Sequence, residues 1–186
     1  MNKNSYAIIM AGGVGSRFWP LSKQKLPKQF LDILGVGETL IQQTFRRLLL
    51  ICPKENIFVV TNEDYFSLCK SQIPELNDNQ ILCEPVMRNT APCIAYAAFK
   101  IHALNDQANL IVAPSDHLIT NDIEYVRIVN EIFETIHEKD YLVTLGIQAS
   151  RPDTGYGYIQ YDDSLYLEEN NNIKKVKTFT EKPNRD

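Results

Sequence analysis

The chain has 186 residues, of which 44% are hydrophobic and 23% are charged, and its formal net charge is −4. These values are typical of a globular protein and exclude a disordered or membrane-spanning chain. A nucleic-acid-binding surface needs clustered cations, which this mildly acidic sequence does not predict. Single nucleotides, rather than polymers, are therefore the expected nucleotide ligands.

The length, the N-terminus and the cysteines all favour one cytoplasmic domain. A chain of 186 residues can bury one core, so we expect a single domain over residues 1–186. The first apolar stretch, Tyr6 to Ala11, is too short for a signal peptide or a membrane span, and no membrane partner is expected. The cysteines are widely spaced without a C-x-x-C pair, which favours buried free thiols over disulfides. They are Cys52, Cys69, Cys83 and Cys93.

A short strand at the start of the chain leads into a glycine-rich loop. The β-branched, apolar run from Ile8 to Met10 predicts a buried strand. Glycines let the backbone amides after it approach an anion, and a guanidinium closes the far side. The loop is therefore predicted to bind phosphate. The residues expected to take part are Ala11, Gly12, Gly13, Gly15, Ser16 and Arg17.

Two better-known glycine loops fit this stretch poorly. A P-loop needs a second glycine where Arg17 stands, followed by Lys-Ser or Lys-Thr. A dinucleotide-binding fingerprint that begins at Gly13 would need its third glycine at Phe18, and Pro20 interrupts the helix that should follow. On the glycines alone, a turn without any ligand stays open as an alternative.

Helices and strands then alternate along the chain, which predicts an α/β fold with a mostly parallel sheet covered on both faces. Such sheets bind ligands at the carboxyl ends of their strands. In the first helix, the apolar residues share one face and Arg46 and Arg47 are expected on the other. The expected helices are Glu38–Ile51, Glu63–Ile73, one beginning near Thr90, and Ile123–His137, and the expected strands are Asn56–Thr61, Gln80–Cys83, Asn109–Ala113 and Tyr141–Gly146.

The pattern changes from Thr154 onward. Two β segments, Gly157–Tyr161 and Ile173–Phe179, are separated by the polar run Asp162–Asn172. Within that run, we expect an exposed turn over Glu168–Asn172.

Five motifs in order resemble the sugar-1-phosphate nucleotidyltransferases. The glycine loop reads GGVGSRFWPLS, and its FWPLS part is similar to the mannose-1-phosphate guanylyltransferase branch. The resemblance spans nearly the whole chain. It implies a Rossmann-like, GT-A-like three-layer fold, with a β addition that covers the sugar. The later motifs are PKQF (Pro27–Phe30), EPVMRNTAP (Glu84–Pro92), PSDHLI (Pro114–Ile119), TGYGYI (Thr154–Ile159) and FTEKP (Phe179–Pro183), of which PKQF belongs to the same signature as the glycine loop.

The resemblance implies that mannose 1-phosphate attacks the α-phosphorus of GTP, which gives GDP-mannose and pyrophosphate. Such a transfer relies on positioning and charge rather than on a protein nucleophile. Arg17 is expected to hold the β- and γ-phosphates, and the resemblance assigns Lys28 to phosphate binding. Asp116 is the expected ligand of Mg²⁺, which prefers one or two carboxylates besides phosphate oxygens and water. As an alternative, Asp116 caps a helix that begins near Leu118.

Base and sugar recognition are expected from the later motifs. The carboxylate of Glu84 can accept hydrogen bonds from N1 and N2 of guanine, an acceptor pair that adenine cannot use, and Arg88 lies near it in the same motif. Asn89 and Thr90 are expected at the nucleotide too, although both residue types also cap helices. The residues expected at the sugar phosphate are Gly155, Tyr156 and Gly157, which approach the ring, Glu181, which accepts from its hydroxyls, and Lys182, which binds its phosphate.

Other readings of these motifs remain open. A sibling enzyme with another NTP or sugar, or a non-catalytic regulatory homologue that binds nucleotide sugars, would share them. A regulator would have no need of Arg17, Lys28, Asp116 and Lys182 together, so these residues disfavour it. A homodimer is compatible with the sequence.

The end of the chain raises a further expectation. The sequence stops just after the EKP motif, whereas the family it resembles continues and supplies a second metal carboxylate. Asp153, Asp162 and Asp163 are poor replacements, the last two because a β turn is expected there. We therefore expect a chain truncated at its C-terminus, with an incomplete metal site, weak nucleotide binding, slow turnover and an exposed sheet edge or apolar patch.

Overall fold

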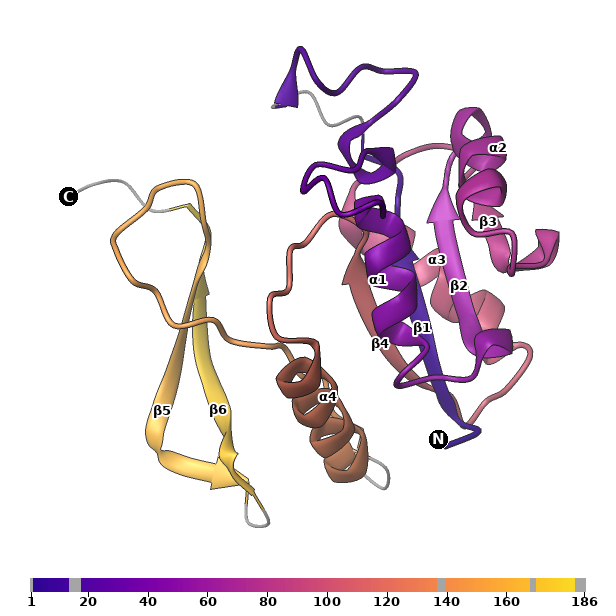
Figure 1. Cartoon of the computed structure of the whole chain (residues 1–186). Coiled ribbons are helices and arrows are strands. Elements are labelled where there is room, and N and C mark those ends of the chain that lie inside the picture. The colour runs from indigo at the N-terminus through magenta and orange to yellow at the C-terminus, as the bar shows by residue number, and fades with distance from the viewer. Residues whose placement is uncertain (1, 14–17, 137–139, 168–169, 183–186) are drawn as a thin grey trace. The chain divides into compact units, whose positions relative to one another are not determined.

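The computed structural model describes residues 2–13, 18–136, 140–167 and 170–182 (Figure 1). The chain forms two compact units, Met1–Phe133 and Glu134–Asp186. The first contains a parallel sheet with helices, and the second contains a β hairpin. No helix in the described residues is both long enough and apolar enough to cross a membrane.

The first unit is built on a four-stranded sheet with the order β3-β2-β1-β4, in which every neighbouring pair is parallel. The two central strands are buried along almost their whole length, which explains their continuous apolar sequence. Because all four strands run in the same direction, their carboxyl ends meet at one edge of the sheet. The strands are β1 (Ser5–Met10), β2 (Ile57–Thr61), β3 (Ile81–Cys83) and β4 (Asn109–Pro114).

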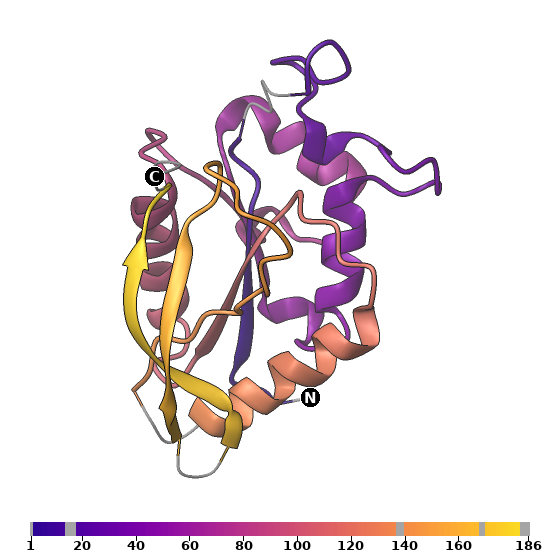
Figure 2. The same ribbon diagram turned by 90° about the vertical axis from the view of Figure 1, so that its left-hand side faces the viewer.

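Helices cover both faces of this sheet, with α1 and α3 on opposite sides of β1 (Figure 2). Successive side chains of β1 point to opposite faces. Ile8 accordingly belongs to a core cluster with Ala97 and Ile101 of α3. The predicted α/β three-layer fold is thus confirmed. The helices are α1 (Leu40–Leu48), α2 (Glu63–Gln72), α3 (Thr90–His102) and α4 (Asp122–Ile136).

Local capping signals in the sequence fix the starts of α1 and α2. Thr39 and Gln42 form a capping box at the start of α1. The Asn62 side chain accepts a hydrogen bond of 3.1 Å from the backbone N–H of Tyr65 at the start of α2. The predicted helices and the strands of the first unit are all present, with shifted ends.

The four cysteines are free, as predicted. Cys52, Cys69 and Cys93 are buried, whereas Cys83 is half-buried.

The prediction that Arg47 lies on the polar face of the first helix is wrong. Its side chain is only 4% exposed, and its Nε donates to Oδ1 of Asp122 at 2.6 Å. The guanidinium also lies 5.5 Å from the ring of Tyr125. The two partners lie on α4, so this buried arginine is paired with a counter-ion that is 25% exposed. The periodicity of α1 alone could not reveal a second helix packed beside it.

The prediction of a strand over Tyr141–Gly146 is also wrong, because this segment has no regular secondary structure. A strand needs a neighbour for its backbone N–H and C=O groups, and no described strand pairs with this one.

The second unit contains the antiparallel strands β5 (Tyr158–Leu167) and β6 (Asn170–Thr180). Both predicted β segments are confirmed, but the strands extend into the polar run between them. Asp162 and Asp163 therefore lie in β5 and not in a turn, within an irregular stretch between the pairs Tyr161–Val176 and Tyr166–Lys174. Of the turn predicted over Glu168–Asn172, the first two residues lie outside the described residues and the rest belong to β6.

The structure predicts that loss of the partner of the buried Arg47 lowers stability more than loss of the exposed Arg46 side chain. Asp122→Ala leaves the buried guanidinium of Arg47 without its partner, so it should lower the free energy of unfolding by roughly 2 kcal/mol. Arg46→Ala removes a guanidinium that is 53% exposed and should change this energy by less than about 0.5 kcal/mol. Urea denaturation of both variants tests this, and equal losses would contradict the structural role of the buried pair.

Candidate active site

Three of the predicted motifs lie at the edge of the sheet where the strands end, which we call the rim. Backbone hydrogen bonds join them there. The N–H of Ala11 donates to the carbonyl of Val60 at 2.8 Å, and the N–H of Glu84 to that of Thr61 at 2.8 Å. Ser115, just before Asp116, donates its N–H to Met10 at 3.1 Å. The prediction that the glycine loop, Glu84 and Asp116 share one edge is confirmed.

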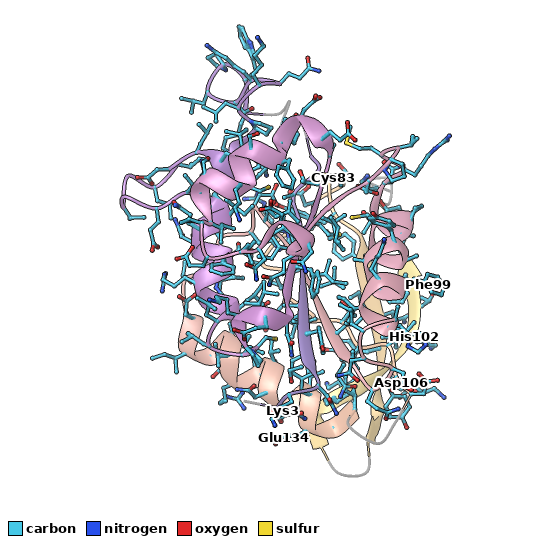
Figure 3. The ribbon with its side chains drawn as sticks, turned by 90° about the vertical axis from the view of Figure 1, so that its right-hand side faces the viewer. Lys3, Cys83, Phe99, His102, Asp106 and Glu134 are labelled. Carbon is cyan, nitrogen blue, oxygen red and sulfur yellow. The ribbon has the colours of Figure 1, made fainter. Side chains whose placement is uncertain are left out.

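Figure 3 shows the extent of the first unit along its strands. Cys83, the residue before Glu84, lies toward the rim, whereas His102 and Lys3 lie toward the opposite end. His102, at the end of α3, is thus remote from the predicted site.

The beginning of the glycine loop is held by buried side chains. The Nε2 atom of Gln29 donates to the carbonyls of Ala11 at 3.0 Å and Gly13 at 2.9 Å, and Oγ1 of Thr61 donates to Ala11 at 3.1 Å. Gly12 is close to Glu84, because a Cβ on this glycine would lie 3.6 Å from Oε2 of that carboxylate. The other predicted loop residues, Gly15, Ser16 and Arg17, lie outside the described residues.

Gln29 and Thr61 are rim residues that the sequence reasoning missed. Gln29 had a signal, because it belongs to the PKQF motif beside Lys28. Thr61 is one polar residue at the end of an apolar strand, and such a residue has no signature of its own.

Lys28 and Asp116, two of the predicted catalytic residues, form an ion pair. The Nζ–Oδ2 distance is 2.7 Å, and the side chains are 26% and 28% exposed. The same Nζ atom lies 5.2 Å from the centre of the Phe18 ring. A partly exposed pair contributes little to folding stability. Each charge can, however, meet a ligand group of opposite sign, a phosphate for the lysine and a cation for the carboxylate.

The alternative that Asp116 caps a helix near Leu118 is wrong. Asp116 lies in a turn after β4, and the next helix begins at Asp122. The side chain of Asn121 accepts the backbone N–H of Glu124 at 3.0 Å and so performs the capping.

The carboxylate of Glu84 interacts with the thiol of Cys93 on α3. Burial raises the pKa of Glu84 above its usual value, and a hydrogen bond with the Cys93 thiol partly offsets this rise. Burial, together with the nearby carboxylate, raises the pKa of Cys93 to about 11. The thiol therefore stays protonated and can donate to Glu84 at neutral pH.

The segment after Glu84 includes a strained residue. Asn89 has φ 66° and ψ −165°, a region that is almost restricted to glycine, at a cost of about 1–3 kcal/mol for other residues. It occupies the N-cap position of α3, yet its side chain makes no capping hydrogen bond. The capping alternative for this side chain is therefore wrong. Arg88, Asn89 and Thr90 are all exposed.

The predicted sugar-phosphate residues lie in the second unit, where pairing of Tyr158 with Thr180 brings two motifs together. A Cβ on Gly157 would lie 3.3 Å from Oε2 of Glu181, so only a glycine fits there without a shift. The Nζ atom of Lys182 lies 3.3 Å from Oε1 of Glu181, and both side chains are exposed. Gly155 and Tyr156 are exposed too.

A cavity of about 700 Å³ lies elsewhere, along β3 and α3. Phe58, Leu82, Tyr96 and Lys100 are among its lining residues, and none of the predicted site residues takes part. The proposed chemistry does not use it.

Comparison with known proteins identifies the family. Residues 6–186 match the family described as nucleotidyl transferase. The chain belongs to the nucleotidyl transferase family. It is 39% identical over 184 residues to the alginate biosynthesis protein AlgA of Pseudomonas aeruginosa, covering 95% of this chain and 36% of that protein. It is 39% identical over 181 residues to a mannose-1-phosphate guanylyltransferase of Klebsiella pneumoniae, covering 96% and 38%.

A solved structure confirms the nucleotidyl transferase fold. It is described as a mannose-1-phosphate geranyltransferase from Thermus thermophilus, with a TM-score of 0.83 and 31% identity, and the match covers 97% of this chain and 51% of that one. The chain thus spans about half of this structure, and 36% and 38% of the two relatives above.

Nucleotidyltransferases of this family generally use a divalent metal. Within the described residues, no three His, Cys, Asp or Glu side chains are grouped closely enough to form a protein cage for one. The single carboxylate of Asp116 does fit a hard cation that takes most of its ligands from phosphate and water.

The raised pKa of Glu84 predicts a pH-dependent stability difference. Folding raises the pKa of this acid, so its contribution to stability is fully present below the pKa of an ordinary glutamate and is lost as pH rises through the raised value. Glu84→Gln should therefore have a higher Tm than the unaltered chain at pH 7, with the gap closing toward pH 4.

Thermal melts between pH 4 and pH 8 check this, with Glu75→Gln at an exposed loop position as the control. A Tm difference between Glu84→Gln and the unaltered chain that is independent of pH would contradict the prediction.

Proposed function

We propose that this chain catalyses the transfer of GMP from GTP to α-D-mannose 1-phosphate. The observation that carries this proposal is the Lys28–Asp116 pair at the rim, beside a glycine loop, in a chain related to a protein named mannose-1-phosphate guanylyltransferase. A phosphate oxygen of the sugar phosphate attacks the α-phosphorus of GTP. The bond to the bridging oxygen of the β-phosphate breaks, and GDP-mannose and pyrophosphate form.

The loop and its cations bind the triphosphate in this proposal. Amides of Gly12, Gly13 and Gly15 donate to phosphate oxygens, and Arg17 neutralises the β- and γ-phosphates that leave as pyrophosphate. Lys28 moves from Asp116 to a phosphate oxygen when GTP binds. Positioning and charge neutralisation lower the barrier, and no protein nucleophile is needed.

Asp116 is the residue that would hold Mg²⁺, which would supply neutralisation of phosphate charge and orientation of the phosphate oxygens for in-line displacement. The transfer of Lys28 to phosphate frees the Asp116 carboxylate, so one ion pair supplies both a phosphate ligand and a metal ligand.

Glu84 selects guanine in this proposal. Its carboxylate accepts from N1 and N2 of the base, while the Cys93 thiol holds it from the protein side. Arg88, Asn89 and Thr90 line the same nucleotide site. The mannose phosphate is assigned to Gly155, Tyr156, Gly157, Glu181 and Lys182. The cytoplasmic location and a homodimer stay predictions.

Pyrophosphate release by the 186-residue chain tests the function. GTP, ATP, UTP and dTTP are each combined with mannose 1-phosphate or glucose 1-phosphate, with Mg²⁺ present. The fastest release is expected from GTP with mannose 1-phosphate. Binding of GTP without pyrophosphate release from any combination would favour the regulatory alternative instead.

Removal of either cationic side chain, Lys28 or Arg17, should slow turnover. Lys28→Ala and Arg17→Ala should each lower kcat by about 100-fold, the usual effect of losing one charged or polar transition-state contact. The melting temperature should change little, because both residues belong to polar segments. The matched control is Lys25→Ala, at an exposed position of the same basic segment. If both variants turned over as fast as the unaltered chain, a phosphate-binding role for the glycine loop would be excluded.

The base preference should depend on Glu84. Glu84→Gln should weaken GTP binding relative to ATP by about 10-fold, because an amide oxygen replaces only part of a double acceptor. Competition binding with the two nucleotides measures the ratio. An unchanged preference would assign guanine recognition to backbone groups.

A further inference from the structure

The carbonyl of Ala11, at the start of the glycine loop, is fixed from two sides. Nε2 of Gln29 donates to it at 3.0 Å and Oγ1 of Thr61 at 3.1 Å. Gln29 is 2% exposed and Thr61 is 0% exposed, so water does not compete for this carbonyl. Two buried donors use both lone pairs of the oxygen, and its direction is therefore set.

The fixed carbonyl determines where the next amide points. A trans peptide is planar, and its C=O and N–H bonds point in opposite directions. The only cis bond among the described residues is Trp19–Pro20, so the bond from Ala11 to Gly12 is trans. The N–H of Gly12 consequently points away from Gln29 and Thr61, and no acceptor for it exists within the described part of the chain.

The same glutamine holds a second carbonyl of the loop. Nε2 of Gln29 also donates to Gly13 at 2.9 Å, so a single nitrogen draws the carbonyls of two loop residues to the same side. Gln29 directly follows Lys28, the partner of Asp116, and the Thr61 carbonyl accepts the N–H of Glu84. The two residues that hold the loop are thus direct neighbours of the other predicted binding groups, Gln29 along the chain and Thr61 through a backbone hydrogen bond.

We propose that Gln29 and Thr61 are positioning residues that aim the Gly12 amide at the phosphates of the nucleotide. This inference rests on the proposed function of the loop and extends it to two residues that need not touch the ligand. They act by fixing one peptide plane. With the plane fixed in advance, binding does not have to order it.

Thr61→Val and Gln29→Met test this role. Valine keeps the shape of threonine without the hydroxyl, and methionine keeps the length of glutamine without the amide donors. Thr61→Ser restores a hydroxyl donor and serves as the rescue variant. The readout is the ratio of the dissociation constants for guanosine and GTP, measured by calorimetry, because only GTP carries the phosphates.

Gln80 provides a matched control at a distance from the rim. It is also a buried glutamine, and its Nε2 donates to the carbonyls of Lys54 and Ile57, both at 2.8 Å. Gln80→Met therefore removes the same two donations to backbone carbonyls as Gln29→Met, and also the two hydrogen bonds that Oε1 of Gln80 accepts from Asn77. A purely structural role predicts the same result for both variants, namely a lower Tm and an unchanged ratio.

We expect the ratio to fall by about 10-fold in Thr61→Val and in Gln29→Met, the effect of misdirecting one charge-assisted hydrogen bond. It should stay unchanged in Thr61→Ser and Gln80→Met. An unchanged ratio in Thr61→Val would overturn the inference, even if Gln29→Met failed to fold. If the unaltered chain bound GTP no more tightly than guanosine, the phosphate-binding loop itself would be excluded, and the proposed function would fail first.

Discussion

The parallel pairing of β1 with β2 and β4 is the constraint on which the candidate site depends. Parallel neighbours cannot be joined by a tight turn, so the chain returns through helices before each new strand. Every strand then ends at the same rim, and the groups that follow each strand meet there. Gly12, Glu84 and Asp116 are far apart in sequence, and this topology brings them to the same edge.

Two ion pairs of the first unit differ in their exposure to solvent, and this difference gives them different roles. The Arg47–Asp122 pair joins α1 to α4 through a guanidinium that is almost fully buried, and its loss would leave a buried charge. The Lys28–Asp116 pair is about a quarter exposed and lies at the rim. Its contribution to folding is small, and solvent or a ligand can reach both charges. The first pair is structural, whereas the second is suited to binding.

Two features of the rim lower the folding stability of the first unit. The Glu84 carboxylate is partly desolvated, which raises its pKa, and the backbone of Asn89 occupies a conformation that disfavours a side chain. Favourable buried bonds surround these groups, such as those of Gln29 and Thr61 to the Ala11 carbonyl. An arrangement of this kind is expected where the geometry serves a ligand, because folding alone would select the unstrained alternative.

The sequence by itself determined the α/β class and most of the elements, because apolar periodicity is a local property, and its five ordered motifs carried the resemblance to the family. It placed the loop, Glu84 and Asp116 at strand ends. Because the carboxyl ends of parallel strands meet at one edge of the sheet, it also predicted that these groups lie at the same edge. Only the tertiary structure decided that Arg47 is buried, that Tyr141–Gly146 forms no strand, and that Gln29 holds the glycine loop. Each of these depends on a partner distant in the chain, and a local pattern describes one segment but not the neighbour that packs on it.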